Sequence, residues 1–253
     1  MNEFAGRHAL ITGGGTGIGA ATARMLAAGG AKVSLLGRRI EALEAISSET
    51  GASAYACDVT DRAAMSSAFE AARQASGAFD FVILNAGIGD SEPFARTTRE
   101  RFDAIIATNL TAVFDGAQLA LADLLSGEDK RLIVVASVAG LKGGAYAAPY
   151  VASKHGAVGL VRSLALEFAK TGLTVNAICP SFVDTPMVDD SAARISRATR
   201  RSDEESRAAL AALNANGRLI TADEVASSIV NLCRPLSRSI NGACVTIDGG
   251  TSA

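Results

Sequence analysis

The chain has no tryptophan, only two histidines, and four cysteines that never form a C-x-x-C pair. The cysteines are scattered along the chain, at Cys57, Cys179, Cys233 and Cys244. Zinc sites and disulfide frameworks need regularly spaced ligands or cysteines, so this pattern argues against both. We therefore expect no metal site and mostly buried free thiols, which fits a reducing cytoplasm.

A dominant charge sign and long hydrophobic runs are also missing. The 24 lysines and arginines nearly balance the 26 aspartates and glutamates, so nothing favours nucleic acid or an anionic membrane as a partner. The apolar runs are short and strand-like, as at 81–84 and 132–135, well below the roughly 20 residues of a membrane-spanning helix. The first residues lack the charged-then-apolar layout of a secretory signal. These absences predict a cytoplasmic protein without a membrane or nucleic acid partner.

Apolar runs typical of strands alternate with longer helical patterns along the whole chain. Seven strands are expected, at 9–12, 32–36, 53–57, 81–84, 132–136, 174–178 and 243–247. Six helical patterns lie between them, at 19–28, 40–49, 62–75, 99–125, 150–170 and 222–232. Near-continuous apolar strands are typical of a sheet that is covered on both faces. We predict one α/β domain over residues 1–253: a doubly wound, mostly parallel seven-stranded sheet with helices on both faces.

Five glycines lie between the first strand and the first helix, in the sequence T-G-G-G-T-G-I-G from Thr12 to Gly19. Glycine permits positive φ and lets the backbone approach a pyrophosphate, whose charge then meets the N-terminus of the helix. The place of this loop, after a strand and before a helix, predicts a dinucleotide site, with a tight turn as the alternative. The expected contact residues are Gly13, Gly15, Thr16, Gly17, Ile18 and Gly19.

The end of the second strand bears on which dinucleotide is bound. The general fingerprint has an acidic residue about 20 residues after the glycines, but here Arg38 and Arg39 follow the strand. An arginine at this place pairs with a 2′-phosphate, which favours NADP(H) over NAD(H). NAD(H) stays possible, because Thr16 adds no second basic group and both arginines can simply open the next helix in solvent. After the third and fourth strands, further cofactor contacts are expected at Asp58, Val59, Asn85, Ala86 and Gly87.

Tyr150 and Lys154 stand four residues apart in Y-V-A-S-K, and Ser137 precedes the tyrosine by thirteen residues. Residues four apart lie on one face of a helix, so the Lys154 ammonium is expected near the Tyr150 phenol. An isolated phenol titrates at about pH 10, and a nearby positive charge lowers its pKa. A tyrosine tuned in this way acts as an acid or a base on a carbonyl or an alcohol.

Taken together, these residues resemble the short-chain dehydrogenase/reductase family in its single-domain form. The resemblance covers essentially the whole chain and rests on motifs that occur in the family's order: T-G-G-G-T-G-I-G, L-N-A-G, N-L at 109–110, V-A-S-V-A-G, Y-V-A-S-K and I-D-G-G. It implies a Rossmann-like fold, a homotetramer, and an NAD(P)(H)-dependent oxidoreductase that interconverts a ketone and a secondary alcohol. Two positions depart from the usual pattern, Leu84 in place of an asparagine and Ser181 in place of a glycine.

The resemblance also implies roles for individual residues. Tyr150 is the expected acid or base, and Lys154 is expected to lower its pKa and to bind the nicotinamide ribose. Ser137 is expected to donate to the substrate oxygen, and Asn109 to hold a water in a proton relay. Further cofactor contacts are expected after the sixth strand, at Pro180, Val183 and Thr185, with helix capping as the alternative for the threonine.

The expected substrate is a small ketone or alcohol under a lid formed by residues 186–216. The predicted substrate contacts are Ser137, Val138, Tyr146, Tyr150 and Ser181. The lid segment carries five arginines, Arg194, Arg197, Arg200, Arg201 and Arg207. They either meet the phosphates of an acyl thioester, as a loose resemblance to 3-oxoacyl and polyketide-type reductases implies, or form a mixed-charge solvated helix with neighbouring acids. The second interpretation is favoured because acids are interspersed with the arginines.

The sequence therefore favours an NADP(H)-dependent ketone reductase or secondary-alcohol dehydrogenase. One alternative is an NAD-dependent catabolic dehydrogenase of a hydroxyacyl thioester or a cyclic alcohol. Another is a non-catalytic dinucleotide-sensing protein on the same fold. The intact set of Asn109, Ser137, Tyr150 and Lys154 argues against the sensor.

Overall fold

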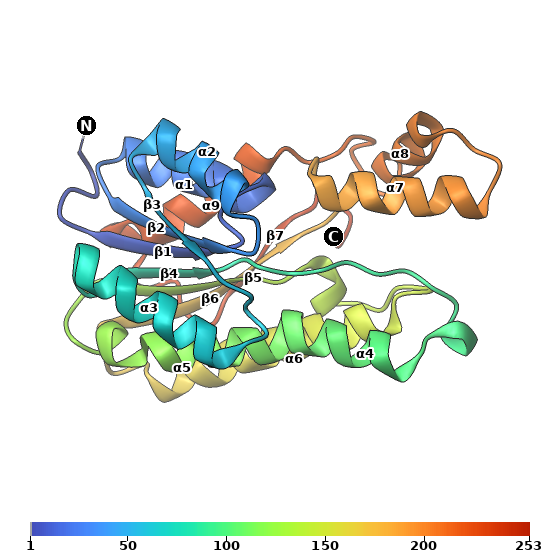
Figure 1. Ribbon diagram of the computed structural model, residues 1–253. Coiled ribbons are helices and arrows are strands. Elements are labelled where there is room, and N and C mark those ends of the chain that lie inside the picture. The colour runs from blue at the N-terminus through green and yellow to red at the C-terminus, as the bar shows by residue number, and fades with distance from the viewer. Residues whose placement is uncertain (1) are drawn as a thin grey trace.

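The computed structural model describes residues 2–253, and a parallel sheet forms its centre (Figure 1). Its seven strands are β1 (His8–Thr12), β2 (Lys32–Gly37), β3 (Ser53–Ala56), β4 (Phe81–Leu84), β5 (Lys130–Val135), β6 (Leu173–Pro180) and β7 (Cys244–Ile247). They lie in the order β3-β2-β1-β4-β5-β6-β7, and every neighbouring pair is parallel. The predicted doubly wound fold is therefore confirmed, with a sheet that is wholly rather than mostly parallel.

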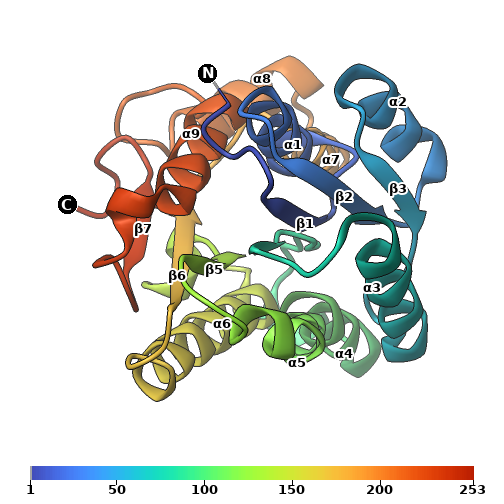
Figure 2. The ribbon, with the colours of Figure 1, turned by 90° about the vertical axis from the view of Figure 1, so that its left-hand side faces the viewer.

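Helices cover both faces of the sheet, as the end-on view shows (Figure 2). One face carries α1 (Gly17–Ala28), α2 (Ile40–Thr50) and α9 (Ala222–Cys233), and the other carries α3 (Arg62–Ser76), α4 (Arg99–Ile106), α5 (Ala112–Leu124) and α6 (Ala148–Glu167). Each face has its own apolar cluster, one with Leu26 and Ile229 and the other with Phe69 and Val161. Because β1 and β6 bury every residue, both of their faces lie in the core, which explains why most of their residues are apolar.

The helix predicted over 99–125 is interrupted in the middle. A π-helical turn, η2 (Ala107–Thr111), separates α4 from α5. By length and composition, the combined run Arg99–Leu124 is apolar enough to cross a membrane, which the short apolar strands had not suggested. However, Val113 and Leu124 belong to the apolar cluster against the sheet, so this run is a core helix of the domain.

The segment that breaks the alternation of strands and helices folds into two further helices. These are α7 (Pro186–Ala198) and α8 (Asp203–Ala211), which follow β6 and lie at the right-hand end of the molecule in Figure 1. Val188 and Ala192 of α7 pack against Leu210 of α8 in a small apolar cluster of their own. The segment is therefore a packed helical pair, and its role as a lid stays a prediction.

Candidate active site

The candidate site lies at the edge of the sheet where the parallel strands end. β1, β4, β5 and β6 are consecutive neighbours in the sheet, and they end at Thr12, Leu84, Val135 and Pro180. Several predicted site residues, Gly13, Asn85, Ser137 and Ser181, follow within two residues of these strand ends. Ligands of open α/β sheets bind outside this edge, so the fold gathers the selected residues where a ligand is expected.

The glycine loop after β1 is held by the chain that follows β4. Gly13 has a φ of 67°, and a side chain there would place its Cβ 2.9 Å from the Asn85 Nδ2 atom. That amide nitrogen donates to the carbonyl oxygens of Thr12 and Gly13, at 3.0 and 3.2 Å. Asn85 therefore holds the glycine loop in place, and its amide nitrogen is engaged in these two hydrogen bonds.

At two more glycines the neighbouring chain leaves no space for a side chain. A Cβ at Gly15 would lie 3.1 Å from the backbone of Ala42 in α2, and one at Gly17, where φ is 54°, would lie 2.9 Å from the Thr185 methyl group. The backbone between β1 and α1 thus packs closely against α2 and the start of α7, and it forms a glycine cradle at the N-terminus of α1. This arrangement fits a pyrophosphate, because it combines close backbone approach with a helix N-terminus.

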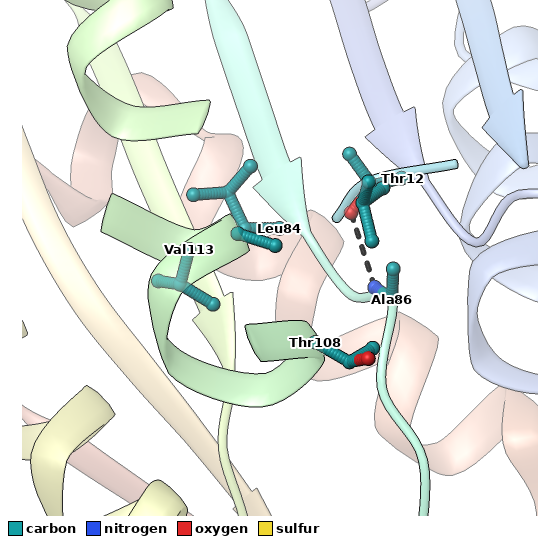
Figure 3. Close-up of a pocket in the computed structure, with 7 residues that line it drawn as sticks. Thr12, Leu84, Ala86, Thr108 and Val113 are labelled. Carbon is teal, nitrogen blue, oxygen red and sulfur yellow. Dashed lines mark hydrogen bonds between the residues drawn. The ribbon is translucent and has the colours of Figure 1, made fainter. Parts of the chain in front are cut away.

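A small cavity lies between the ends of β1 and β4 and the π-helical turn (Figure 3). The Thr12 hydroxyl accepts hydrogen bonds from the backbone N–H groups of Asn85 and Ala86, both at 3.0 Å, and so ties the two strand ends together. Val59 also lines this cavity, and only 8% of its surface is exposed. The side chain of Val59 thus belongs to the core, and its predicted cofactor contact stays a prediction.

Arg38 and Arg39 are exposed at the end of β2, just before α2. Among residues 2–253, no carboxylate lies within 4.0 Å of either guanidinium. Asp58 stands nearby after β3, and its carboxylate accepts from the backbone N–H and the hydroxyl of Thr60, at 2.9 and 2.8 Å. These hydrogen bonds, and to a lesser degree the charge of Arg38, lower the pKa of Asp58. Two uncommitted cations thus stand beside the glycine loop.

Ser137, Tyr150 and Lys154 come together around the ends of β5 and β6. The Lys154 Nζ atom lies 5.7 Å from the centre of the Tyr150 ring, on the same face of α6, as the spacing of four predicts. The ammonium donates to the Val135 carbonyl oxygen at 2.9 Å. The Ser137 hydroxyl donates to the Pro180 carbonyl oxygen at 3.3 Å and accepts from the Ala139 N–H at 3.1 Å.

Burial acts on the tyrosine and the lysine in opposite directions. It raises the pKa of the Tyr150 phenol, and the nearby Ser137 hydroxyl offsets only part of that rise. It lowers the pKa of the Lys154 ammonium from 10.5 to about 8, because removal from water disfavours the charged form. In the protein by itself, burial therefore holds the pKa of Tyr150 above its usual value, and the expectation that Lys154 lowers that pKa stays a prediction.

Asn109 lies in the π-helical turn and is completely buried. Its amide exchanges two hydrogen bonds with the backbone of Ile88, both at 2.9 Å, and donates a third to the Ser153 hydroxyl at 3.2 Å. Gly87 lies beside both residues: a Cβ atom at this glycine would be 3.3 Å from the Asn109 Oδ1 atom and 3.6 Å from the Lys154 Nζ atom. Asn109 therefore positions the chain beside Lys154, and its predicted water relay stays a prediction because most of its side-chain capacity is used within the protein.

The remaining predicted residues surround this centre to different degrees. Val138 and Val183 are buried, and Ser181 is half-buried after β6. Thr185 stands at the start of α7 but does not cap it, since its hydroxyl donates to the Val183 carbonyl oxygen at 3.2 Å. Tyr146 has a φ of 62°, and 65% of its surface is exposed, so its predicted place in the substrate pocket stays a prediction.

Three residues that hold the site together were not predicted from the sequence. These are Thr12, which bridges β1 and β4, Ile88, which pairs with Asn109, and Ser153, whose hydroxyl donates to the Tyr150 carbonyl oxygen at 2.7 Å. Thr12 lies in T-G-G-G-T-G-I-G and Ser153 in Y-V-A-S-K, so the motifs already placed both residues at the site. Ile88 acts only through its backbone, and its side chain gives no signal.

The chain belongs to the short-chain dehydrogenase family, because the model of that family, "short chain dehydrogenase", matches residues 7–196. It is therefore an NAD(P)-dependent oxidoreductase. Levodione reductase of Leifsonia aquatica is 36% identical over 99% of this chain and 96% of its own. The 3-oxoacyl-acyl-carrier-protein reductase FabG of Escherichia coli K12 is 34% identical over 98% of each chain. The crystal structure of a single-substitution variant of actinorhodin polyketide ketoreductase with NADPH matches with a TM-score of 0.92, at 33% identity over 97% of each chain.

Proposed function

We propose that this protein is a ketoreductase that prefers NADPH and reduces a ketone to a secondary alcohol with Tyr150 as the proton donor. The observation that carries the proposal is the arrangement of the Tyr150 phenol, the Ser137 hydroxyl and the Lys154 ammonium around one strand edge, beside a glycine cradle that fits a dinucleotide. The similarity to FabG and to a polyketide ketoreductase supports the same class of substrate.

The chain's own groups are suited to hold a nicotinamide dinucleotide. The backbone from Gly13 to Gly19 receives the pyrophosphate, and the ribose and carboxamide contacts fall to Lys154 and to the chain from Pro180 to Thr185. When bound, the dinucleotide supplies the hydride to the carbonyl carbon. The protein then has to stabilise and protonate the oxygen, where negative charge develops.

Tyr150 and Ser137 act on that oxygen. Burial raises the pKa of the phenol, so Tyr150 is protonated near neutral pH and ready to donate. The Ser137 hydroxyl, which donates to Pro180 in the absence of substrate, donates to the substrate oxygen instead. Lys154, whose pKa is about 8, exchanges a proton easily near neutral pH and is suited to resupply Tyr150. For alcohol oxidation the same groups act in reverse, with Tyr150 as the base.

The preference for NADPH rests on Arg38 and Arg39. Their guanidiniums are exposed beside the glycine loop and have no carboxylate partner within residues 2–253, so a 2′-phosphate finds two free cations there. The alternative is an NAD-dependent dehydrogenase, which the lack of a basic group at Thr16 favours. One experiment separates the two.

We predict that Arg38→Ala lowers kcat/KM for NADPH by about 10-fold or more and changes kcat/KM for NADH by less than about twofold, because charge-assisted hydrogen bonds to the 2′-phosphate are lost. Steady-state kinetics with both cofactors and one ketone measures this ratio. Arg238→Ala, which removes an exposed arginine before β7, is the matched control and changes neither value. Equal losses with both cofactors for Arg38→Ala contradict the NADPH preference.

The proposal extends to a cytoplasmic homotetramer. Phe114 on α5 and Leu166 on α6 expose 45% and 81% of their surfaces, and a second copy would cover such apolar side chains. Light scattering after size-exclusion chromatography measures the assembly, and a mass of one chain contradicts it.

A further inference from the structure

The arginines of the segment 186–216 differ in their partners. Arg207 of α8 pairs with Asp184 and Asp189, which fits the mixed-charge surface that the sequence favoured. Arg194 of α7 has no such partner: among residues 2–253, no carboxylate lies within 4.0 Å of its guanidinium. Its Nη2 atom lies 3.0 Å from the Ser191 hydroxyl and 3.5 Å from the Gly89 carbonyl oxygen, and its Nε atom is buried without an acceptor.

Arg194 faces the loop that leads from the catalytic centre. Met187, Ser191 and Arg194 follow one another at steps of four and three residues, so they share one face of α7. That face packs against Gly89, since a Cβ atom at this glycine would lie 3.3 Å from the Met187 sulfur. Gly89 stands two residues after Gly87, which borders Lys154. The guanidinium therefore lies over the same loop that lines the proposed site.

The acids in this loop do not neutralise Arg194. Asp90 and Glu92 both pair with Arg101 of α4, at 2.5 and 3.1 Å. A partly buried guanidinium with an N–H that lacks an acceptor carries a desolvation cost, and an oxyanion would remove that cost with charge-assisted hydrogen bonds. No carboxylate of residues 2–253 lies within 4.0 Å of this guanidinium, so the oxyanion would come from a bound ligand. The contact of Arg194 with Gly89, two residues beyond the Gly87 that borders Lys154, favours the substrate over the dinucleotide phosphates at the glycine loop.

We propose that Arg194 is a substrate-binding residue that recognises an oxyanion on the ketone. The oxyanion is either the carboxylate of a keto acid or a phosphate on the carrier arm of a keto thioester. This inference rests on the proposed ketone reduction. The Ser191 hydroxyl, which donates to the Met187 carbonyl oxygen at 2.8 Å, holds the guanidinium in place.

Two matched pairs of ketones test the inference. Acetoacetate and methyl acetoacetate differ by a carboxylate charge, and acetoacetyl-CoA and acetoacetyl-N-acetylcysteamine differ by the phosphate-bearing arm. For each pair, the ratio of kcat/KM between the anionic and the neutral ketone is measured in the wild type, Arg194→Gln, Arg194→Lys and Arg197→Gln. Arg197 is the control because it stands on the same helix, is exposed and has no carboxylate partner among residues 2–253.

In Arg194→Gln, we expect the ratio to fall about 10- to 100-fold in at least one pair, mainly through KM, because a charge-assisted contact is lost. Arg194→Lys keeps most of the ratio, and Arg197→Gln leaves it unchanged. The pair that responds identifies a carboxylate or a phosphate as the anion. As a check without a variant, added salt lowers kcat/KM of the wild type for the anionic ketone more than for the neutral one.

Ratios that stay unchanged in both pairs for Arg194→Gln overturn the inference, as does equal salt dependence for charged and neutral ketones. A wild type that reduces other ketones but none of these four also overturns the inference. A wild type that reduces no ketone, β-keto ester or acyl thioester with either cofactor contradicts the proposed function instead, so the two failures are distinguishable.

Discussion

The buried lysine of the site costs the folded protein stability. Lys154 is 5% exposed, and its ammonium meets one carbonyl oxygen and no carboxylate among the described residues. Its pKa falls from 10.5 to about 8, which corresponds to a cost on the order of 3 kcal/mol at neutral pH. Such a cost is expected where a charged group is kept for binding and chemistry rather than for folding.

We predict that Lys154→Met abolishes turnover but raises the free energy of unfolding at pH 7 by about 1–2 kcal/mol, the desolvation gain less one lost hydrogen bond. The pKa of Lys154 is lower in the folded chain than in the unfolded chain, so the cost is fully present below pH about 8 and vanishes as the pH rises to 10.5. The difference in the free energy of unfolding between Lys154→Met and the wild type therefore decreases between about pH 8 and 10.5. Denaturant unfolding at several pH values measures it.

Lys170→Met is the control, because Lys170 is exposed just after α6, and it changes stability by less than about 0.5 kcal/mol. A Lys154→Met protein that is less stable than the wild type at pH 7 contradicts the account of burial.

At the scale of elements, the glycine loop and the start of α7 are built against each other. Gly17 has a φ of 54°, and its Cα faces the Thr185 methyl group with no room for a Cβ. The chain from Pro180 to Thr185 therefore reaches the N-terminus of α1 only because residue 17 is glycine. The two segments that are proposed to hold the two ends of the dinucleotide meet at this contact.

We predict that Gly17→Ala lowers the free energy of unfolding by about 1–2 kcal/mol, the cost of a left-handed conformation in an L-residue, and weakens NADPH binding as Thr185 is displaced. Thermal unfolding and a fluorescence titration with NADPH measure the two effects. Gly159→Ala in α6, whose Cβ would meet no atom within 4 Å, leaves binding unchanged and adds up to about 1 kcal/mol of stability. Normal binding by Gly17→Ala contradicts the role of this contact.

The elements themselves were largely predictable from the sequence. β1 and β6 are buried along their whole length, so most of their residues are apolar, and this pattern allowed both strands to be predicted. The π-helical turn at Asn109 was not predictable, because it keeps helical periodicity on both sides and depends on hydrogen bonds to Ile88, a distant residue. The packed pair of α7 and α8 was missed because Val188, Ala192 and Leu210 are few apolar residues in a polar segment.

At the scale of the whole molecule, the strand order decides which residues meet. β1 lies between β2 and β4, so the glycine loop after β1 adjoins Arg38 on one side and Asn85 on the other. Periodicity predicted the strands but not their order, which the structure supplies. The direction of the pKa of Tyr150 also needed the whole molecule, because spacing brings a charge near the phenol but does not show how deeply the phenol is buried.

The whole molecule also explains why the substrate was the least predictable part. The proposed cofactor contacts lie at strand ends, whose places follow from the fold, whereas the proposed substrate contact Arg194 lies on α7, against the loop between β4 and α4. Whether Arg194 stands free or paired depends on where Asp90, Glu92 and Asp189 find partners, and they find them in Arg101 and Arg207. Such pairings are set by tertiary packing and leave no pattern in the sequence.

The central claim is that Tyr150 is the proton donor for ketone reduction, and its most direct test is the turnover of Tyr150→Phe. The wild type is first screened with ketones, β-keto esters and acyl thioesters, each with NADPH and NADH, and the best pair is used. The account predicts that kcat falls about 100- to 10,000-fold in Tyr150→Phe while NADPH binding is kept. Tyr55→Phe, which changes a tyrosine of β3 whose hydroxyl donates to the Ala71 carbonyl oxygen at 3.5 Å, keeps wild-type turnover. Wild-type turnover by Tyr150→Phe with that ketone would contradict the proposed function.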